Sequence, residues 1–145
     1  MKTLLITGFD TFGGETINPA WEALKALPEQ IGGWQLRKLQ IPTVFGLAAA
    51  RTLAYAAECR PDAVLCIGQA GTRSAVTPEY VGINLRHARI ADNLGNQPQD
   101  EPVVPGGPTA YFATVPVRTM TAAIEAQGIP AAVSYTAGLS LIHIS

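Results

Sequence analysis

The chain has 145 residues, of which 48% are hydrophobic and 14% charged. A chain of this length and apolar content can bury a sizeable core, so we predict one globular domain and exclude a disordered segment. Ten basic and eleven acidic residues give a net charge of -1, and the sequence contains no basic run. This charge pattern argues against nucleic acid or an anionic membrane as the partner and favours a small molecule or peptide.

The first residues and the two cysteines indicate a soluble cytoplasmic protein. The apolar run after Lys2 is too short for a secretory signal, and Arg51 interrupts a second apolar stretch well short of a membrane span. In a chain without an export signal, Cys59 and Cys66 are expected to be free thiols. Neither cysteine lies in a CxxC pair, so we expect no zinc site.

Strands and helices are expected to alternate in the first half of the chain: a strand over 2–7, a helix over 19–27, a strand over 34–41, a helix from about 45 to 58 and a strand over 62–68. Asn18 is the expected N-cap of the first helix, with Pro19 in its first position. The continuous apolar run within 62–68 is typical of a strand covered on both faces.

The second half predicts a strand or hairpin arm over 80–89, a helix over 115–127 that Gly128 stops, and a strand over 131–135. The segment 92–108 is rich in Gly, Pro, Asn and Gln, which is typical of a long loop near a functional site. Strands that alternate with helices indicate an α/β protein with a mainly parallel sheet and helices on both faces.

A glycine-rich segment, Gly8-Phe9-Asp10-Thr11-Phe12-Gly13-Gly14, joins the first strand to the first helix. Ligands bind at this position in open α/β sheets. The segment has neither GxGxxG nor a GK[ST] ending, so a nucleotide site is disfavoured. Two aromatic residues that flank an acid suit a flat, uncharged ring, although Phe9 and Phe12 would equally serve to close the edge of the core.

Several short motifs follow one another along the chain: the glycine segment 8–14, Asn18-Pro19, Gly68-Gln69-Ala70-Gly71, Thr77-Pro78-Glu79, Ile83-Asn84, Ala88-Arg89-Ile90, and Asp92-Asn93 with Gly95-Asn96-Gln97-Pro98. Together, over residues 1 to about 138, they resemble pyroglutamyl peptidase I, the pyrrolidone-carboxylate peptidases of cysteine peptidase family C15. The resemblance implies a three-layer α/β/α sandwich with a mainly parallel twisted sheet, phosphorylase/hydrolase-like and incomplete at the C-terminus. It also implies a cysteine peptidase that removes N-terminal pyroglutamate (5-oxoproline) from peptides and needs no cofactor.

The resemblance assigns roles to six residues by position. Glu79 matches the catalytic glutamate that orients a histidine and stabilises it as imidazolium, and Arg89 would lie near the developing oxyanion. The residues expected to contact the substrate are Phe9 and Phe12, which would line the lactam pocket, and Asn18 and Gln69, which would supply amide hydrogen bonds. A neutral pocket of this kind rejects a charged amino terminus. Taken alone, Glu79 and Arg89 would be a solvated strand-end acid and a surface arginine, and only the surrounding match favours the catalytic roles.

The resemblance ends after Gly138. The spacing of the family places the nucleophilic cysteine at position 142, where this chain has Ile142, and the later helix that carries the histidine is absent. We therefore expect residues 1–138 to be the N-terminal part of a single peptidase domain, residues 139–145 to be a non-native tail, and the chain as printed to be inactive. A replacement triad of Cys66, His87 and Glu79 is disfavoured, because the apolar run around Cys66 predicts a buried, inert thiol.

Two other functions are left open by the residues. One is a non-catalytic module that binds pyroglutamyl peptides without turning them over. The other is a nucleoside-processing α/β enzyme, which rests on analogy of fold alone. A homo-oligomer of the complete protein is compatible with both the resemblance and the sequence.

Overall fold

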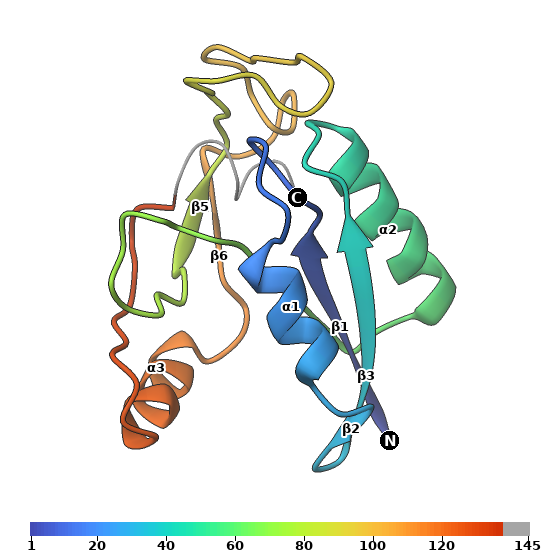
Figure 1. Ribbon diagram of the computed structural model, residues 1–145, viewed down its shortest axis with the longest axis vertical. Coiled ribbons are helices and arrows are strands. Elements are labelled where there is room, and N and C mark those ends of the chain that lie inside the picture. Colours follow the sequence, from blue (N-terminus) through green and yellow to red (C-terminus); the bar gives the residue numbers. More distant parts are fainter. Residues whose placement is uncertain (138–145) are drawn as a thin grey trace. The chain divides into compact units, whose positions relative to one another are not determined.

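A computed structural model of the chain describes residues 1–137, which form two compact units (Figure 1). Unit 1 comprises Met1–Gln69 and Ala88–Gln97, and unit 2 comprises Ala70–His87 and residues 98–137. Within the described residues, every helix is too short or too polar to cross a membrane.

Unit 1 is built on a four-stranded sheet with the order β2-β3-β1-β4. Its strands are β1 (Lys2–Phe9), β2 (Gln30–Ile31), β3 (Trp34–Ile41) and β4 (Ala63–Ile67). The strand β1 runs parallel to both β3 and β4, while the two-residue β2 pairs antiparallel with β3. The predicted mainly parallel sheet is therefore confirmed, and within this sheet the sequence patterns missed β2.

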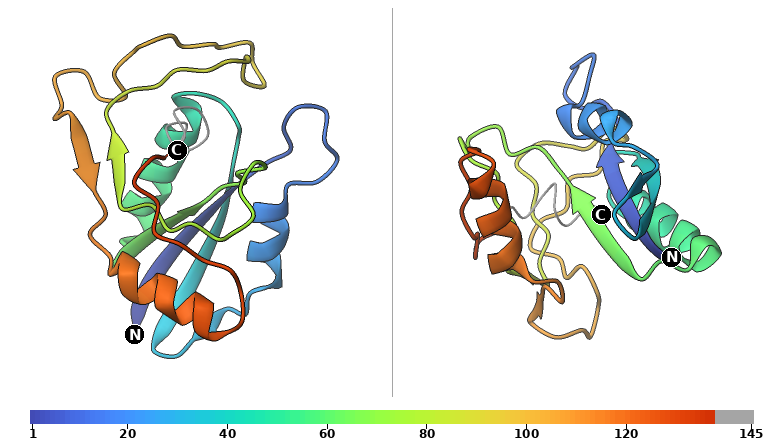
Figure 2. Two further views of the ribbon diagram at one scale, coloured as in Figure 1. Left: turned by 90° about the vertical axis from the view of Figure 1, so that its left-hand side faces the viewer. Right: turned by 90° about the horizontal axis from the view of Figure 1, so that it is seen from below.

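Two helices, α1 (Pro19–Ala26) and α2 (Leu47–Cys59), lie on opposite faces of this sheet, as the two directions of view show (Figures 1 and 2). On the α1 side, Leu24 packs with Ile6 of β1 and Leu36 of β3 in a buried cluster. Gly8 permits this close packing, because a Cβ at that position would lie 3.2 Å from the backbone N and Cα of Trp21. The layered α/β/α arrangement is thus present within unit 1.

The strand β4 differs from the prediction that both of its faces are covered. Leu65 and Ile67 pack against the core cluster, but Val64 is 42% exposed and Cys66 is exposed as well. Because β4 is an outer strand of the four-stranded sheet, an apolar run here marks only one covered face. The prediction of a buried Cys66 is therefore wrong.

Unit 2 contains a short antiparallel pair, β5 (Val81–Ile83) with β6 (Ala110–Phe112), and the helix α3 (Val117–Ala126). The helix agrees with the prediction, and Gly128 follows it with a positive φ of 78°. In place of the predicted strand over 131–135, the structure has isolated parallel bridges, Val76 with Ala131 and Glu79 with Ser134. The predicted arm over 80–89 is reduced to the three residues of β5.

Candidate functional site

The two aromatic residues of the glycine segment differ in how deeply they are buried. Phe9 ends β1 and is 2% exposed, with its ring 3.7 Å from the place that a Cβ on Gly68 would occupy. Phe12 is half-buried, and Gly13 and Gly14 follow it with positive φ angles of 66° and 80°. Glycine adopts this backbone conformation at low cost, so the sequence builds a tight turn directly after Phe12. The lactam-pocket role of both rings stays a prediction.

Asp10, the acid between these rings, is bound to the neighbouring strand end. Its Oδ1 accepts hydrogen bonds from the backbone N–H and the hydroxyl of Thr43, both at 2.9 Å. The side-chain amide of Asn93 donates to the backbone oxygen of Thr11 at 2.9 Å. The ends of β1 and β3 and the Asp92-Asn93 motif are therefore joined within unit 1, and Asp10 is already committed to protein donors.

The buried carboxylate of Asp92 organises the segment that carries Arg89. It accepts hydrogen bonds from the backbone N–H of Phe45 at 2.8 Å and from those of Leu94 and Asn96 at 2.9 Å each. Burial raises the pKa of Asp92, but the hydrogen bonds from the Asn96 side chain and from these three N–H groups outweigh it, so the pKa lies below its ordinary value of 3.8. Asp92 is therefore a charged structural anchor at neutral pH.

The other residues predicted in unit 1 are placed at or near strand and helix ends. Asn18 caps α1, because its Oδ1 accepts from the backbone N–H of Ala20 and its Nδ2 donates to the backbone oxygen of Asp10, both at 3.0 Å. Gln69 follows β4 and is exposed. Arg89 is exposed too, and its backbone oxygen accepts from the Gln97 amide. Asn18 is thus a confirmed N-cap, while the substrate roles of all three residues remain predictions.

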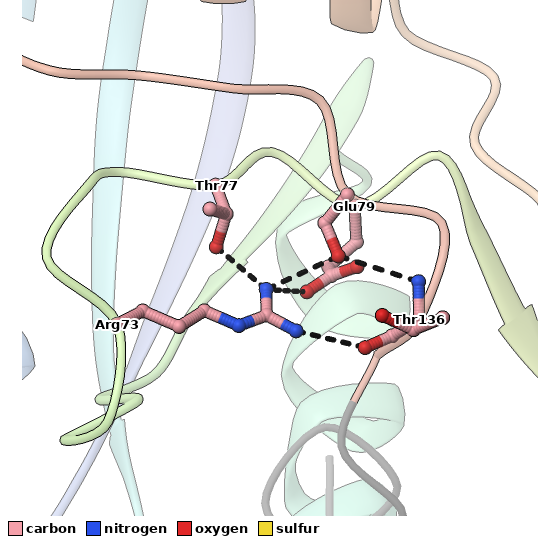
Figure 3. Close-up of polar contacts among 5 residues, drawn as sticks. Arg73, Thr77, Glu79 and Thr136 are labelled. Carbon is pink, nitrogen blue, oxygen red and sulfur yellow. Dashed lines mark hydrogen bonds and ion pairs between the residues drawn. The ribbon is translucent and has the colours of Figure 1, made fainter.

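In unit 2, Glu79 is held by an arginine that the sequence had not singled out. Arg73 Nη1 donates to Glu79 Oε1 at 2.8 Å, to Thr77 Oγ1 at 2.7 Å and to Ser134 Oγ at 3.1 Å (Figure 3). Its Nη2 donates to the backbone oxygen of Thr136 at 2.8 Å. The side chains of Arg73 and Glu79 are 27% and 21% exposed, so this ion pair is partly shielded from water.

The second carboxylate oxygen of Glu79 has a different environment. Glu79 Oε2 is buried and accepts no hydrogen bond from any residue in the range 1–137. A buried carboxylate oxygen without a donor is costly, so an atom in this position marks a place where a further N–H or O–H group is expected. Glu79 therefore presents one satisfied and one unsatisfied oxygen.

The remaining titratable candidates have other neighbours. His87 Nδ1 lies 3.5 Å from Asp100 Oδ1 and makes no hydrogen bond with any residue in the range 1–137. Across residues 1–137, no group of three or more His, Cys, Asp or Glu side chains is arranged to hold a metal ion. Position 142 lies outside the described residues, as does the predicted tail.

Comparison with known proteins gives a consistent result. The sequence profile of pyroglutamyl peptidases matches residues 1–144. Pyrrolidone-carboxylate peptidases of Bacillus cereus (strain Q1) and Bacillus thuringiensis (strain Al Hakam) are each 52% identical over 139 residues, which make up 95% of this chain. The chain spans 65% of the length of these relatives.

Solved structures agree with this relationship. Pyroglutamyl peptidase I of Bacillus amyloliquefaciens matches with a TM-score of 0.95 and 47% identity, over 99% of this chain and 70% of that one. Pyrrolidone carboxyl peptidase of Pyrococcus furiosus matches with a TM-score of 0.93 and 41% identity, over 98% of this chain and 69% of that one. These matches confirm the predicted α/β fold, and the chain belongs to the pyroglutamyl peptidase family.

Proposed function

We propose that the residues of this chain serve the removal of N-terminal pyroglutamate from peptides by a cysteine peptidase mechanism. Residues 1–138 would then be the N-terminal part of a single peptidase domain. The observation that carries the proposal is the state of Glu79, a carboxylate with one oxygen held by an arginine and the other buried without a donor among residues 1–137. A triad glutamate needs such an oxygen to accept a histidine N–H.

The chemistry follows the order of an acyl transfer. A histidine takes the proton of the cysteine thiol, and the thiolate attacks the carbonyl carbon of the pyroglutamyl peptide bond. The imidazolium then gives its proton to the leaving amine, and water hydrolyses the thioester that remains. In this scheme Glu79 orients and stabilises the imidazolium, and the exposed Arg89 guanidinium stabilises the oxyanion.

We infer that the proposed substrate pocket favours an uncharged ring. Oδ1 of Asp10 already accepts two hydrogen bonds from Thr43, which leaves this oxygen little capacity to accept from a cationic amino terminus. Asn18 Nδ2 carries two N–H groups and donates one to Asp10, so the second is available for a lactam oxygen. If Phe9 and Phe12 supply apolar walls and Gln69 a side-chain amide, as the resemblance implies, an uncharged five-membered ring is the preferred ligand.

The test compares the chain as printed with a chimera that joins residues 1–138 to the remaining C-terminal part of the Bacillus cereus relative. We expect the chimera to hydrolyse the aminocoumarin amide of pyroglutamate and to lose this activity on thiol alkylation. The corresponding aminocoumarin amide of alanine, which carries a charged amino group, should stay intact. We expect the printed chain to be inactive, because Ile142 stands where the cysteine is predicted. A folded chimera without activity would overturn the proposal.

The binding-module alternative applies to the printed chain alone. It is favoured by one observation, namely that all four predicted substrate contacts lie within unit 1. Calorimetric binding of 5-oxoproline to the printed chain, without turnover, would support this second function. Equal heats for 5-oxoproline and for proline would exclude it.

A further inference from the structure

We propose that Arg73 is a positioning residue for Glu79, which fixes one carboxylate oxygen so that the other faces the histidine N–H. This inference rests on the proposed function. Its starting point is that the guanidinium of Arg73 contacts Oε1 of Glu79 at 2.8 Å, while Oε2 is buried and has no donor within the described chain.

The guanidinium is held from two segments of unit 2. Its acceptors on the near segment are Thr77 and Glu79, and those on the distant segment are Ser134 and Thr136. The backbone joins these segments as well, since the Tyr80 N–H donates to the Ser134 oxygen at 2.8 Å and the Ser134 N–H donates to the Pro78 oxygen at 2.9 Å. A planar fork with acceptors on both of its Nη atoms cannot rotate freely, so Oε1 is bound to a fixed donor.

The contribution of Arg73 is mainly one of geometry. The pair of Arg73 and Glu79 has no net charge, so it adds less to the stability of an imidazolium than an isolated carboxylate would. What the pair provides is a carboxylate with a fixed plane, in which Oε2 is the oxygen without a donor among the described residues and is available to the histidine. Lysine would keep the charge of Arg73, but its single ammonium group would not reach both Oε1 of Glu79 and the Thr136 oxygen.

A purely structural role is the competing interpretation, because the same contacts pin residues 134–136 to residues 73–79. Arg118 offers a matched control for it. This arginine also lies in unit 2 and contacts the same segment, with Nη2 donating to the Tyr135 hydroxyl at 2.8 Å, and its guanidinium lies 5.8 Å from the Tyr80 ring centre. Among the described residues, no carboxylate forms an ion pair with Arg118.

The kinetic experiment uses the chimera described above. We expect R73K to lower kcat on the order of 10- to 100-fold with KM changed less than about twofold, since misplaced catalytic groups cost rate more than binding. Alkylation of the active-site thiol by iodoacetamide at neutral pH should slow in R73K, because a misaligned histidine holds less thiolate. R118K should leave kcat, KM and alkylation unchanged. T77V removes one acceptor and retains the arginine, and should lower kcat by a smaller factor.

The outcomes separate this inference from the proposed function. An inactive wild-type chimera would overturn the proposed function, whereas an active one in which folded R73K keeps its kcat would overturn the role of Arg73. Side-chain NMR of the printed 145-residue chain gives an independent test. The Nη resonances of Arg73 should be resolved in the wild type and averaged in E79A. Averaged Nη resonances in the wild type would show that the Arg73 guanidinium is not held in place, and would refute its positioning role without any measurement of activity.

Discussion

Replacement of Asp92 by asparagine should weaken unit 1 by an amount that depends on pH. Oδ1 of Asp92 accepts from the backbone N–H groups of Leu94 and Asn96, and Oδ2 accepts from the N–H of Phe45 and from the Asn96 side chain. Asparagine offers a single oxygen, so its NH₂ group must face one of these two pairs of donors. The Asn96 side chain also reaches Oδ1, at 3.3 Å, so the amide orientation with the smaller loss leaves the Phe45 N–H without an acceptor, and the other orientation leaves those of Leu94 and Asn96 without one. The charge of the carboxylate is lost in both orientations.

The expected cost follows from these contacts. Each donor left without an acceptor costs about 1–3 kcal/mol, and the amide orientation with the smaller loss leaves one such donor, so D92N should lower the free energy of unfolding by roughly 1–3 kcal/mol at pH 7. The folded-state pKa of Asp92 lies below its ordinary value of 3.8. A lowered carboxyl pKa contributes stability that is fully present above the unfolded-state value and is lost as pH falls through the folded-state value. The difference between wild type and D92N should therefore be constant from about pH 5 to 8 and shrink below about pH 4.

Urea unfolding followed by tryptophan fluorescence is a suitable assay, because both tryptophans of the chain, Trp21 and Trp34, lie in unit 1. D62N is the matched control, since the Asp62 carboxylate accepts one exposed hydrogen bond, from the Thr3 N–H at 2.7 Å. We expect D62N to cost about 1 kcal/mol or less. Equal stability of D92N and wild type at pH 7, or a difference that persists undiminished at pH 3, would refute the reasoning.

Three further changes test the packing of unit 1. G8A should destabilise unit 1 by about 1–3 kcal/mol, because the added methyl group meets the backbone of Trp21. G33A adds a methyl group to open space, so it should cost less than about 1 kcal/mol in the same unfolding assay. N18A should cost about 1 kcal/mol through loss of the helix cap. N18S keeps an acceptor at the cap and should recover part of this difference, although it lacks the amide that donates to the Asp10 backbone oxygen. In the printed chain Cys66 should react rapidly with a thiol reagent because it is exposed, so a fast phase that persists in C66S would contradict its position on β4.

Local signals in the sequence were sufficient where one segment carries all the information. Asn18 and Pro19 marked the start of α1, and the alternating pattern over 34–41 gave the bounds of β3 as the structure has them. Both features depend on neighbours within a few residues. For Asp10 the sequence indicates only an acid between two aromatic rings, because its partner Thr43 follows the end of β3 and no local signal marks the contact.

The errors concern what covers each element. The apolar run of β4 is typical of a strand buried on both faces, but its place at the edge of the sheet in the described residues leaves Val64 and Cys66 exposed. The segment 131–135 has the composition of a strand, yet it meets its partner segment only through isolated bridges at Val76 and Glu79. Apolar patterning reports the tendency to be buried, whereas coverage depends on strand order, which the pattern does not contain.

The ion pair between Arg73 and Glu79 likewise depends on contacts that the local sequence does not reveal. Arg73 and Arg89 flank Glu79 in the sequence, and all three residues lie outside the helices and extended strands. A spacing of six residues therefore says nothing about which side chains meet. The pairing with Arg73 depends on Ser134 and Thr136, which supply two of its acceptors and come from about sixty residues further along the chain. Such a cluster becomes visible only once the parallel bridge between Glu79 and Ser134 is known, and that bridge has no signature in either segment alone.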